Sequence, residues 1–93
     1  MSPNKYKLNL NNLIARNFMI ERTTQDKLII CVNGRLENNN TIDLDILRLI
    51  LYSITRKLRV NNNVNYRCFN RKSLLNKIKG LIDCGDFISN TIF

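Results

Sequence analysis

The residues most able to bind a ligand are Lys and Arg, and they are concentrated in one part of the chain. Between Ile46 and Ile82 the sequence holds nine Lys and Arg residues and no Asp or Glu. The other positions hold six basic and seven acidic residues, so the net charge of +8 comes entirely from this stretch. Lys and Arg side chains neutralise phosphate groups and release their counterions, which makes nucleic acid the first partner to consider.

The absence of acids in this stretch favours binding over solubility as the purpose of the charge. A basic surface kept only for solubility usually mixes both signs and gains from ion pairs four residues apart. Cations at the start of a helix, such as Arg71 and Lys72, also oppose the helix dipole unless an anion lies against them. The candidate RNA-binding residues are nine cations and one aromatic side chain: Arg48, Tyr52, Arg56, Lys57, Arg59, Arg67, Arg71, Lys72, Lys77 and Lys79.

The residue types argue against a catalytic or metal site. The chain has no His, which excludes His-dependent triads, HExxH zinc sites and imidazole proton relays. There is no glycine-rich phosphate loop, and no Ser or Cys has a base to activate it. We therefore expect no enzyme activity, no catalytic residues, no metal, no cofactor and no small-molecule substrate.

The cysteines and the apolar runs indicate a protein of a reducing, aqueous compartment. Cys31, Cys68 and Cys84 are far apart and form no CxxC pair, so we expect buried or half-buried free thiols. The polar N-terminus is unlike a signal peptide. The apolar runs are far shorter than the roughly 20 residues that cross a bilayer. These features predict a cytoplasmic protein without a membrane partner.

Alternating and turn-forming residues predict strands in the first half of the chain. Residues 5–10 alternate strictly, which is typical of a half-buried strand. Residues 18–22 and 27–32 are two further strands, joined into a hairpin by the polar residues 23–26. Asn33-Gly34 predicts a type I′ turn, and a short strand at 35–37 follows it.

Helical periodicity governs the second half of the chain. A helix is expected from about Asp43 to Arg59, capped by Thr41. Its apolar stripe is formed by Leu47, Ile50, Leu51, Ile54 and Leu58. The opposite face is formed by Arg48, Tyr52, Thr55, Arg56 and Arg59.

Three elements are expected after this helix. Residues 64–69 alternate and predict a strand, and a second helix runs from about Arg71 to Ile82. Gly85 suits a turn at the end of that helix, and residues 87–93 form either a strand or a docked tail. The 93 residues therefore predict one α+β domain, 1–93, in two layers: a small antiparallel sheet with two helices on one face.

Structured RNA is the partner that this fold and charge fit best. No helix-turn-helix, zinc finger, basic zipper, GXXG loop or aromatic RNP strand is visible, so recognition through RNA shape and backbone is expected. Tyr52 and Tyr66 could stack on a base, although Tyr66 shares its predicted strand face with Val64 and Cys68, which favours core packing. Two alternatives remain open: a small DNA-binding or viral regulatory protein, and an interaction module for an acidic protein.

Short motifs over about half of the chain also point to a known family. Ile20-Glu21-Arg22, a polar turn and Lys27-Leu28-Ile29 form one motif, and Lys5-Tyr6-Lys7-Leu8 forms another. A third is Tyr52-Ser53-Ile54-Thr55-Arg56-Lys57-Leu58 followed by Asn61-Asn62. These resemble the hairpin, the first strand and the basic helix with its Asn pair in the eukaryotic large-subunit ribosomal protein twenty-two family.

The resemblance implies a ribosomal or ribosome-associated component that binds ribosomal RNA, with other ribosomal proteins as neighbours. It implies Arg56, Lys57 and Arg59 among the RNA contacts. The chain departs from the family pattern at three points: there is little room for the family's first helix, residues 33–42 would be an insertion, and the last helix is unexpected. A lineage-specific ribosomal protein fits the same residues.

A second similarity concerns residues 80–86. Gly80-Leu81-Ile82-Asp83-Cys84-Gly85-Asp86 is similar to the LAGLIDADG motif of homing endonucleases, in which the helix ends in a metal-binding acid. Here only seven residues follow the motif, too few to form the DNA-gripping saddle of that family. We therefore expect Asp83 and Asp86 to be helix-end and turn residues.

Overall fold

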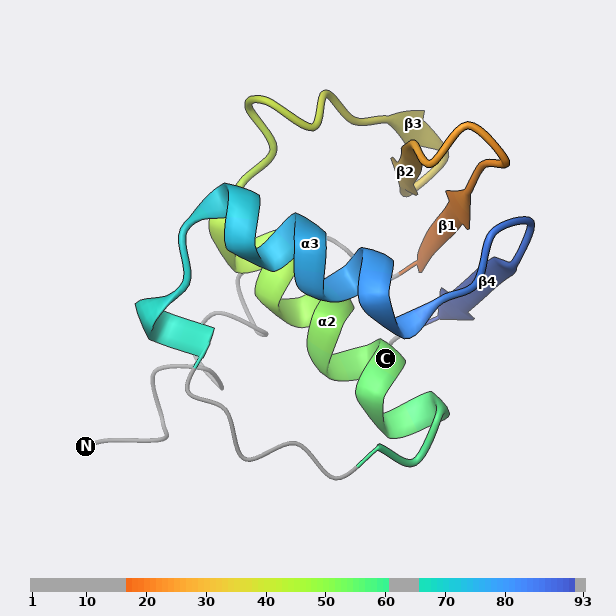
Figure 1. Cartoon of the computed structure of the whole chain (residues 1–93). Helices are drawn as coiled ribbons and strands as arrows, with labels where there is room; N and C mark the ends of the chain where they lie inside the picture. Colours follow the sequence, from red (N-terminus) through yellow and green to blue (C-terminus); the bar gives the residue numbers. More distant parts are fainter. Residues whose placement is uncertain (1–16, 61–65, 92–93) are drawn as a thin grey trace.

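The computed structural model describes residues 17–60 and 66–91, except for the side chains of Tyr66, Asn90 and Thr91. The strand predicted for residues 5–10 and the side chain of Tyr66 lie outside what is described. The described elements are four strands and two α-helices joined by a short 3-10 turn (Figure 1). Within these residues no helix has both the length and the apolar character needed to cross a bilayer.

The four strands form one open antiparallel sheet in the order β3-β2-β1-β4. Their bounds are β1 Asn17–Arg22, β2 Leu28–Val32, β3 Arg35–Leu36 and β4 Phe87–Thr91. In β1 and β2, buried side chains alternate with exposed or half-buried ones, as expected for a sheet with one covered face. Both helices lie on the same side of the sheet (Figure 1). The predicted α+β class, with two helices on one face of a small antiparallel sheet, is confirmed.

Both predicted hairpin turns are present. The β1–β2 turn closes through Thr23, whose N–H donates to the Lys27 carbonyl at 2.8 Å, and Asp26 lies in the left-handed region at φ 64°. Asn33 and Gly34 have φ values of 54° and 78°, as a type I′ turn requires at both central positions. Asn, Asp and Gly tolerate this region better than other residues, which explains why these turns could be predicted.

The core lies between the sheet and the helices. Strand residues that point inward meet the apolar stripes of both helices, and the outward residues Met19, Ile29, Leu36 and Phe87 remain exposed. The fully buried large side chains are Phe18, Ile20, Ile30, Ile42, Leu47, Ile50, Leu51, Ile54, Leu74, Ile78 and Ile82. Burying one such side chain stabilises the fold by about 1.5–3 kcal/mol.

Helix α2 spans Leu44–Lys57 and differs from its prediction at both ends. Its cap is Asp43 rather than Thr41: Asp43 has an extended backbone, and its Oδ1 accepts from the N–H of Asp45 at 2.7 Å. The Thr41 prediction is therefore wrong by two residues, because Asp43 also satisfies the cap pattern and lies directly before the first turn. At the other end the buried stripe stops at Ile54, since Leu58 is 43% exposed.

Helix α3 spans Arg71–Leu81, close to its predicted bounds. Asn70 caps it by accepting from the N–H of Ser73 at 2.7 Å. In Figure 1 the two helices lie side by side and run in the same direction. A hydrogen bond from Arg71 Nε to the Ile42 carbonyl, at 2.9 Å, joins the start of α3 to the residues before α2.

The strand predicted for residues 64–69 is wrong over its described part. Tyr66–Cys68 form the 3-10 turn η1, and residues 64 and 65 lie outside what is described. Phe69 is the side chain that packs against the core, whereas Cys68 is exposed. Within the described residues, this segment pairs with no strand of the sheet and leads directly to Asn70, the cap of α3. A six-residue alternation therefore does not specify a strand without a neighbouring strand.

The segment after α3 forms a strand, β4, over Phe87–Thr91 and is not a docked tail there. Gly85, at φ 86°, and Asp86, which donates from its N–H to the Asp83 carbonyl at 3.0 Å, form the turn after α3. The chain then continues as β4, which pairs with β1 up to Thr91. Asp83 and Asp86 are thus helix-end and turn residues, as the sequence predicts.

Candidate nucleic-acid interface

The candidate binding residues separate into three sets. One set, which we call the α2 end, consists of Tyr52, Arg56, Lys57 and Arg59. A second set, Arg48 and Arg71, is held in contacts within the fold. The third set comprises residues of η1 and α3, namely Arg67, Lys72, Lys77 and Lys79. They do not all lie together, because the two helices run in the same direction, so the α2 end and the first turn of α3 are at opposite ends of the helix pair (Figure 1).

The α2 end carries a stacked aromatic and cation. Tyr52 is 47% exposed, and the Arg56 guanidinium carbon lies 5.6 Å from the centre of its ring, within the range of a cation–π contact. Thr55 was predicted to share this face, but it is only 5% exposed, and its hydroxyl donates to the Tyr52 carbonyl at 2.8 Å. That prediction is wrong because α2 is covered on more than half of its circumference.

Lys57 reaches the sheet edge. Its Nζ donates to the carbonyl of Ser89 in β4 at 2.7 Å. Strand β4 is at the edge of the sheet, and an edge carbonyl needs such a partner or water. The Lys57 ammonium group therefore has a structural role, because it joins α2 to β4.

Arg59 has an unusual backbone for its residue type. It lies at φ 57°, directly after the cap residue Leu58. The N–H of Val60 donates to the Thr55 carbonyl at 2.9 Å, and the N–H of Arg59 donates to the Arg56 carbonyl at 3.1 Å. This is the pairing of a Schellman motif, in which glycine is the preferred residue at the left-handed position. The backbone of Arg59 is strained at this position, where glycine would not be, and its charged side chain is exposed.

Arg48 and Arg71 are engaged within the protein. Arg48 Nη1 lies 2.8 Å from Asp45 Oδ1, three residues earlier on α2, and the Arg48 side chain is 17% exposed. Arg71 donates to the Ile42 carbonyl. Asp45 lies one position before the acid-free stretch 46–82, so counting acids within that stretch did not show that Arg48 has an acidic partner.

The lysines of α3 lie on two flanks. Lys72 and Lys79 are two turns apart and share a stripe, whereas Lys77 is about 200° around the helix from Lys79. Arg71 and Lys72 occupy the first turn, which contains no acid, as the sequence indicated. Arg67 is exposed in η1.

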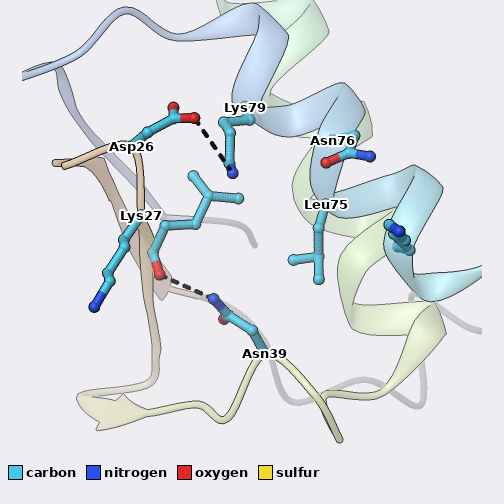
Figure 2. A pocket seen from close by; sticks show the side chains of 8 residues that line it. Asp26, Lys27, Asn39, Leu75, Asn76 and Lys79 are labelled. Atoms are coloured by element: carbon cyan, nitrogen blue, oxygen red, sulfur yellow. Dashed lines mark hydrogen bonds and ion pairs between the residues drawn. The ribbon is translucent and has the colours of Figure 1, made fainter. Parts of the chain in front are cut away.

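Lys72 and Lys79 border a hollow between α3 and the β1–β2 turn (Figure 2). Its volume is about 310 Å³, and it is lined by Asp26, Lys27, Leu28, Asn39, Lys72, Leu75, Asn76 and Lys79. Asn39 Nδ2 donates to the Leu28 carbonyl at 2.9 Å, while Asn39 Oδ1 is buried and accepts no hydrogen bond in the described part of the chain. Only the two lysines among these residues were candidates from the sequence.

Asp26 is the one carboxylate among the residues that line this hollow, and two cations offset it. Arg22 Nε donates to Asp26 Oδ1 at 2.8 Å, and Lys79 Nζ lies 3.9 Å from Asp26 Oδ2. The hydrogen bond from Arg22 is the main reason that the pKa of Asp26 lies below its ordinary value; partial desolvation opposes this shift, and the charge of Lys79 adds to it. The same bond raises the pKa of Arg22. Arg22 and Asp26 were missed because they are four residues apart across a turn.

The cysteines correct one expectation. Cys31 is half-buried, as expected, but Cys68 and Cys84 are exposed, because each lies in a turn next to a helix. All three thiols are free. In the described residues, no three His, Cys, Asp or Glu side chains come together in a way that could hold a metal ion.

Comparisons with protein-family models, with curated proteins and with solved structures gave no match.

Proposed function

We propose that this protein is a small RNA-binding component without enzyme activity, ribosomal or ribosome-associated and cytoplasmic, that contacts the RNA backbone. The observation that carries the proposal is a set of exposed cations without acidic partners. Arg56, Arg59 and Lys72 are exposed and form no ion pair with any residue in the described ranges. A polyanion would supply the missing partners.

The position of Lys72 favours a role in binding over a role in stabilising the helix. Cations near the end of a helix, such as Arg56, stabilise the helix dipole and so have a structural use. Lys72 lies in the first turn of α3, where a cation is unfavourable by a few tenths of a kcal/mol. A bound phosphate reverses that effect, which makes Lys72 the clearest functional cation.

Arg59 supports the proposal independently. A residue held in the left-handed region at a position suited to glycine carries a backbone cost of about 1–2 kcal/mol. Such strain tends to be kept where a side chain has a task. The ring of Tyr52, beside Arg56, offers a surface on which an unpaired base could stack.

The experiment that tests this proposal is a titration of the whole chain with three labelled polyanions at two salt concentrations. They are a structured RNA, a duplex DNA and poly-glutamate. RNA binding predicts the tightest affinity for the structured RNA and a steep loss of affinity with salt. Tighter binding to duplex DNA or to poly-glutamate would replace RNA by one of the two alternatives.

Matched variants locate the interface. The double variant Arg56→Ala/Arg59→Ala should lower the slope of log affinity against log salt by about two, one for each phosphate contact. Arg35→Ala is the control, because Arg35 is an exposed cation on β3, at the sheet edge opposite to β4. A fall of about one in this slope for the control, the same per charge removed as in the double variant, would show that only net charge matters and would overturn the interface. Co-sedimentation with ribosomal particles tests the ribosomal assignment, and a protein that stays at the top of the gradient would contradict it.

A further inference from the structure

The hollow beside α3 has a lining unlike that of a simple anion site. Its walls combine ammonium groups, a carboxylate, amides and apolar side chains. Figure 2 shows Leu75 and Lys79 extending from α3 toward the hairpin, while the Lys27 side chain extends away from α3. Lys72 and Lys79 are therefore the cations that α3 contributes to the hollow.

We propose that this hollow binds one nucleotide, with the phosphate near the lysines and the base against the apolar and amide surface. The proposal deepens the RNA binding proposed above and rests on it for the choice of ligand. Two sources share this chemistry: an RNA nucleotide turned out of its strand, and a free ribonucleotide.

The volume and the apolar lining set the size of the ligand. About 310 Å³ lies at the lower limit of small-ligand pockets, which suits one nucleotide and excludes a duplex. The half-buried Leu75 and the small exposed part of the core residue Leu28 supply apolar surface at the hollow, where the flat face of a base could pack. Inorganic phosphate would make no use of these two side chains.

The polar groups match a nucleotide because they include acceptors as well as donors. Asn76 can both donate to and accept from a base edge. Asn39 Oδ1 is buried, and Asn39 Nδ2 is bonded to Leu28, so Asn76 is the amide that is able to meet a ligand. Asp26 Oδ2 lies 3.9 Å from Lys79 Nζ, beyond hydrogen-bond distance, and so can accept from a ribose hydroxyl.

The local charge permits a phosphate. Asp26 alone would repel a phosphate. However, Arg22 Nε lies 2.8 Å from Asp26 Oδ1, and Lys79 Nζ lies 3.9 Å from Asp26 Oδ2. Lys72 lines the same hollow about two turns earlier on α3 and adds a cation that no acid of the lining offsets. The net charge of the lining is therefore positive at the side of the hollow where α3 begins, because Lys72 lies in the first turn of that helix.

The test is an NMR titration of the ¹⁵N-labelled chain with each of the four ribonucleoside monophosphates, with inorganic phosphate and with the structured RNA. Saturable shifts of the Leu75 and Asn76 amides with a nucleotide, but not with phosphate at the same concentration, are expected. Asn76→Ala and Lys72→Ala should each weaken nucleotide binding by about two- to tenfold. Arg35→Ala is the control, because Arg35 is an exposed cation on β3 outside the candidate interface and the hollow, and it should leave the nucleotide affinity unchanged.

The outcomes distinguish the hollow from the wider interface. Equal binding of phosphate and nucleotide, or no saturable shift at these amides with any nucleotide or RNA, overturns the proposal. If Asn76→Ala leaves RNA affinity unchanged while Arg56→Ala/Arg59→Ala lowers it, the RNA does not occupy the hollow, and the proposed RNA-binding function stands. If nucleotides bind in an Asn76-dependent way and RNA does not bind, the hollow takes a free ribonucleotide and the proposed RNA function fails.

Discussion

Arg22 and Asp26 link the β1–β2 turn to the end of α3. Arg22 Nε donates to Asp26 Oδ1 at 2.8 Å, and Arg22 Nη1 donates to the carbonyls of Lys79 and Ile82 at 3.2 and 3.1 Å. The last carbonyls of a helix have no partner within it, and a cation at this end also favours the helix dipole. One guanidinium group thus caps α3 and fixes the hairpin against it.

Removing this guanidinium should loosen α3 and the hairpin together. Arg22→Gln is expected to lower the midpoint of thermal unfolding more than Asp26→Asn does, because only Arg22→Gln leaves the two helix carbonyls without their donor. Circular dichroism melts of both variants measure this difference. Lys27→Gln, a change of an exposed cation on the same turn, is the control and should melt like the wild type. A larger loss for Asp26→Asn would show that the turn, not the helix cap, is the important contact.

The low pKa of Asp26 predicts a specific pH dependence. Because the folded pKa is below the ordinary value of 3.8, the ionised carboxylate stabilises the folded protein at every pH above that value. This contribution falls as the pH drops from 3.8 through the lower folded pKa. The stability difference between wild type and Asp26→Asn should therefore be constant from pH 7 to pH 5 and should shrink toward pH 3. Urea unfolding at these three pH values measures it, and a difference that does not change with pH would contradict the assignment.

Arg59 should show opposite effects on stability and on binding. Arg59→Gly relieves the left-handed backbone and should raise the free energy of unfolding by about 1 kcal/mol. The same change removes a phosphate contact and should weaken RNA binding. Arg59→Ala is the matched variant, since it removes the charge but keeps the strain: it should weaken binding without the gain in stability. Equal stability of the Gly and Ala variants would show that the backbone of Arg59 is not strained.

The features that could be predicted from the sequence are those with local causes. Asn33-Gly34 specifies its turn by itself because both residues tolerate positive φ. The helices follow from apolar spacing, and Leu74 and Ile78 in α3 are buried as their positions require. For the same reason the two-layer α+β class could be inferred before the strand order was known.

Several of the features that were missed depend on contacts between distant residues. Arg22 lies 57 and 60 residues from the two α3 carbonyls that it caps, so no local pattern reports the contact. The partners of Lys57 and Arg71 are backbone carbonyls 32 and 29 residues away. Counting charges along the chain treats all cations alike, but the fold uses some of them internally. The candidate interface is therefore smaller than the charged stretch suggested.

The cap of α2 can be tested by two neighbouring substitutions. Asp43→Ala removes the acceptor for the Asp45 N–H and should lower the free energy of unfolding by about 1 kcal/mol. Thr41→Ala should have a much smaller effect, although the sequence alone pointed to Thr41, because Thr41 lies outside the first turn and is exposed. Urea unfolding of the two variants measures the difference, and a larger cost for Thr41→Ala would favour the earlier cap.

The charge of Lys72 gives a prediction in which stability and binding change in opposite directions. Lys72→Glu places an acid in the first turn of α3, where it favours the helix dipole, so the free energy of unfolding should rise by about 0.3–1 kcal/mol. Binding of RNA should become weaker, because a cation beside the phosphate is replaced by an anion. Lys72→Gln should fall between wild type and Lys72→Glu in both measurements. If Lys72→Glu lowered stability, the cation would have a structural partner in the fold, and the main reason for assigning Lys72 to a phosphate would be lost.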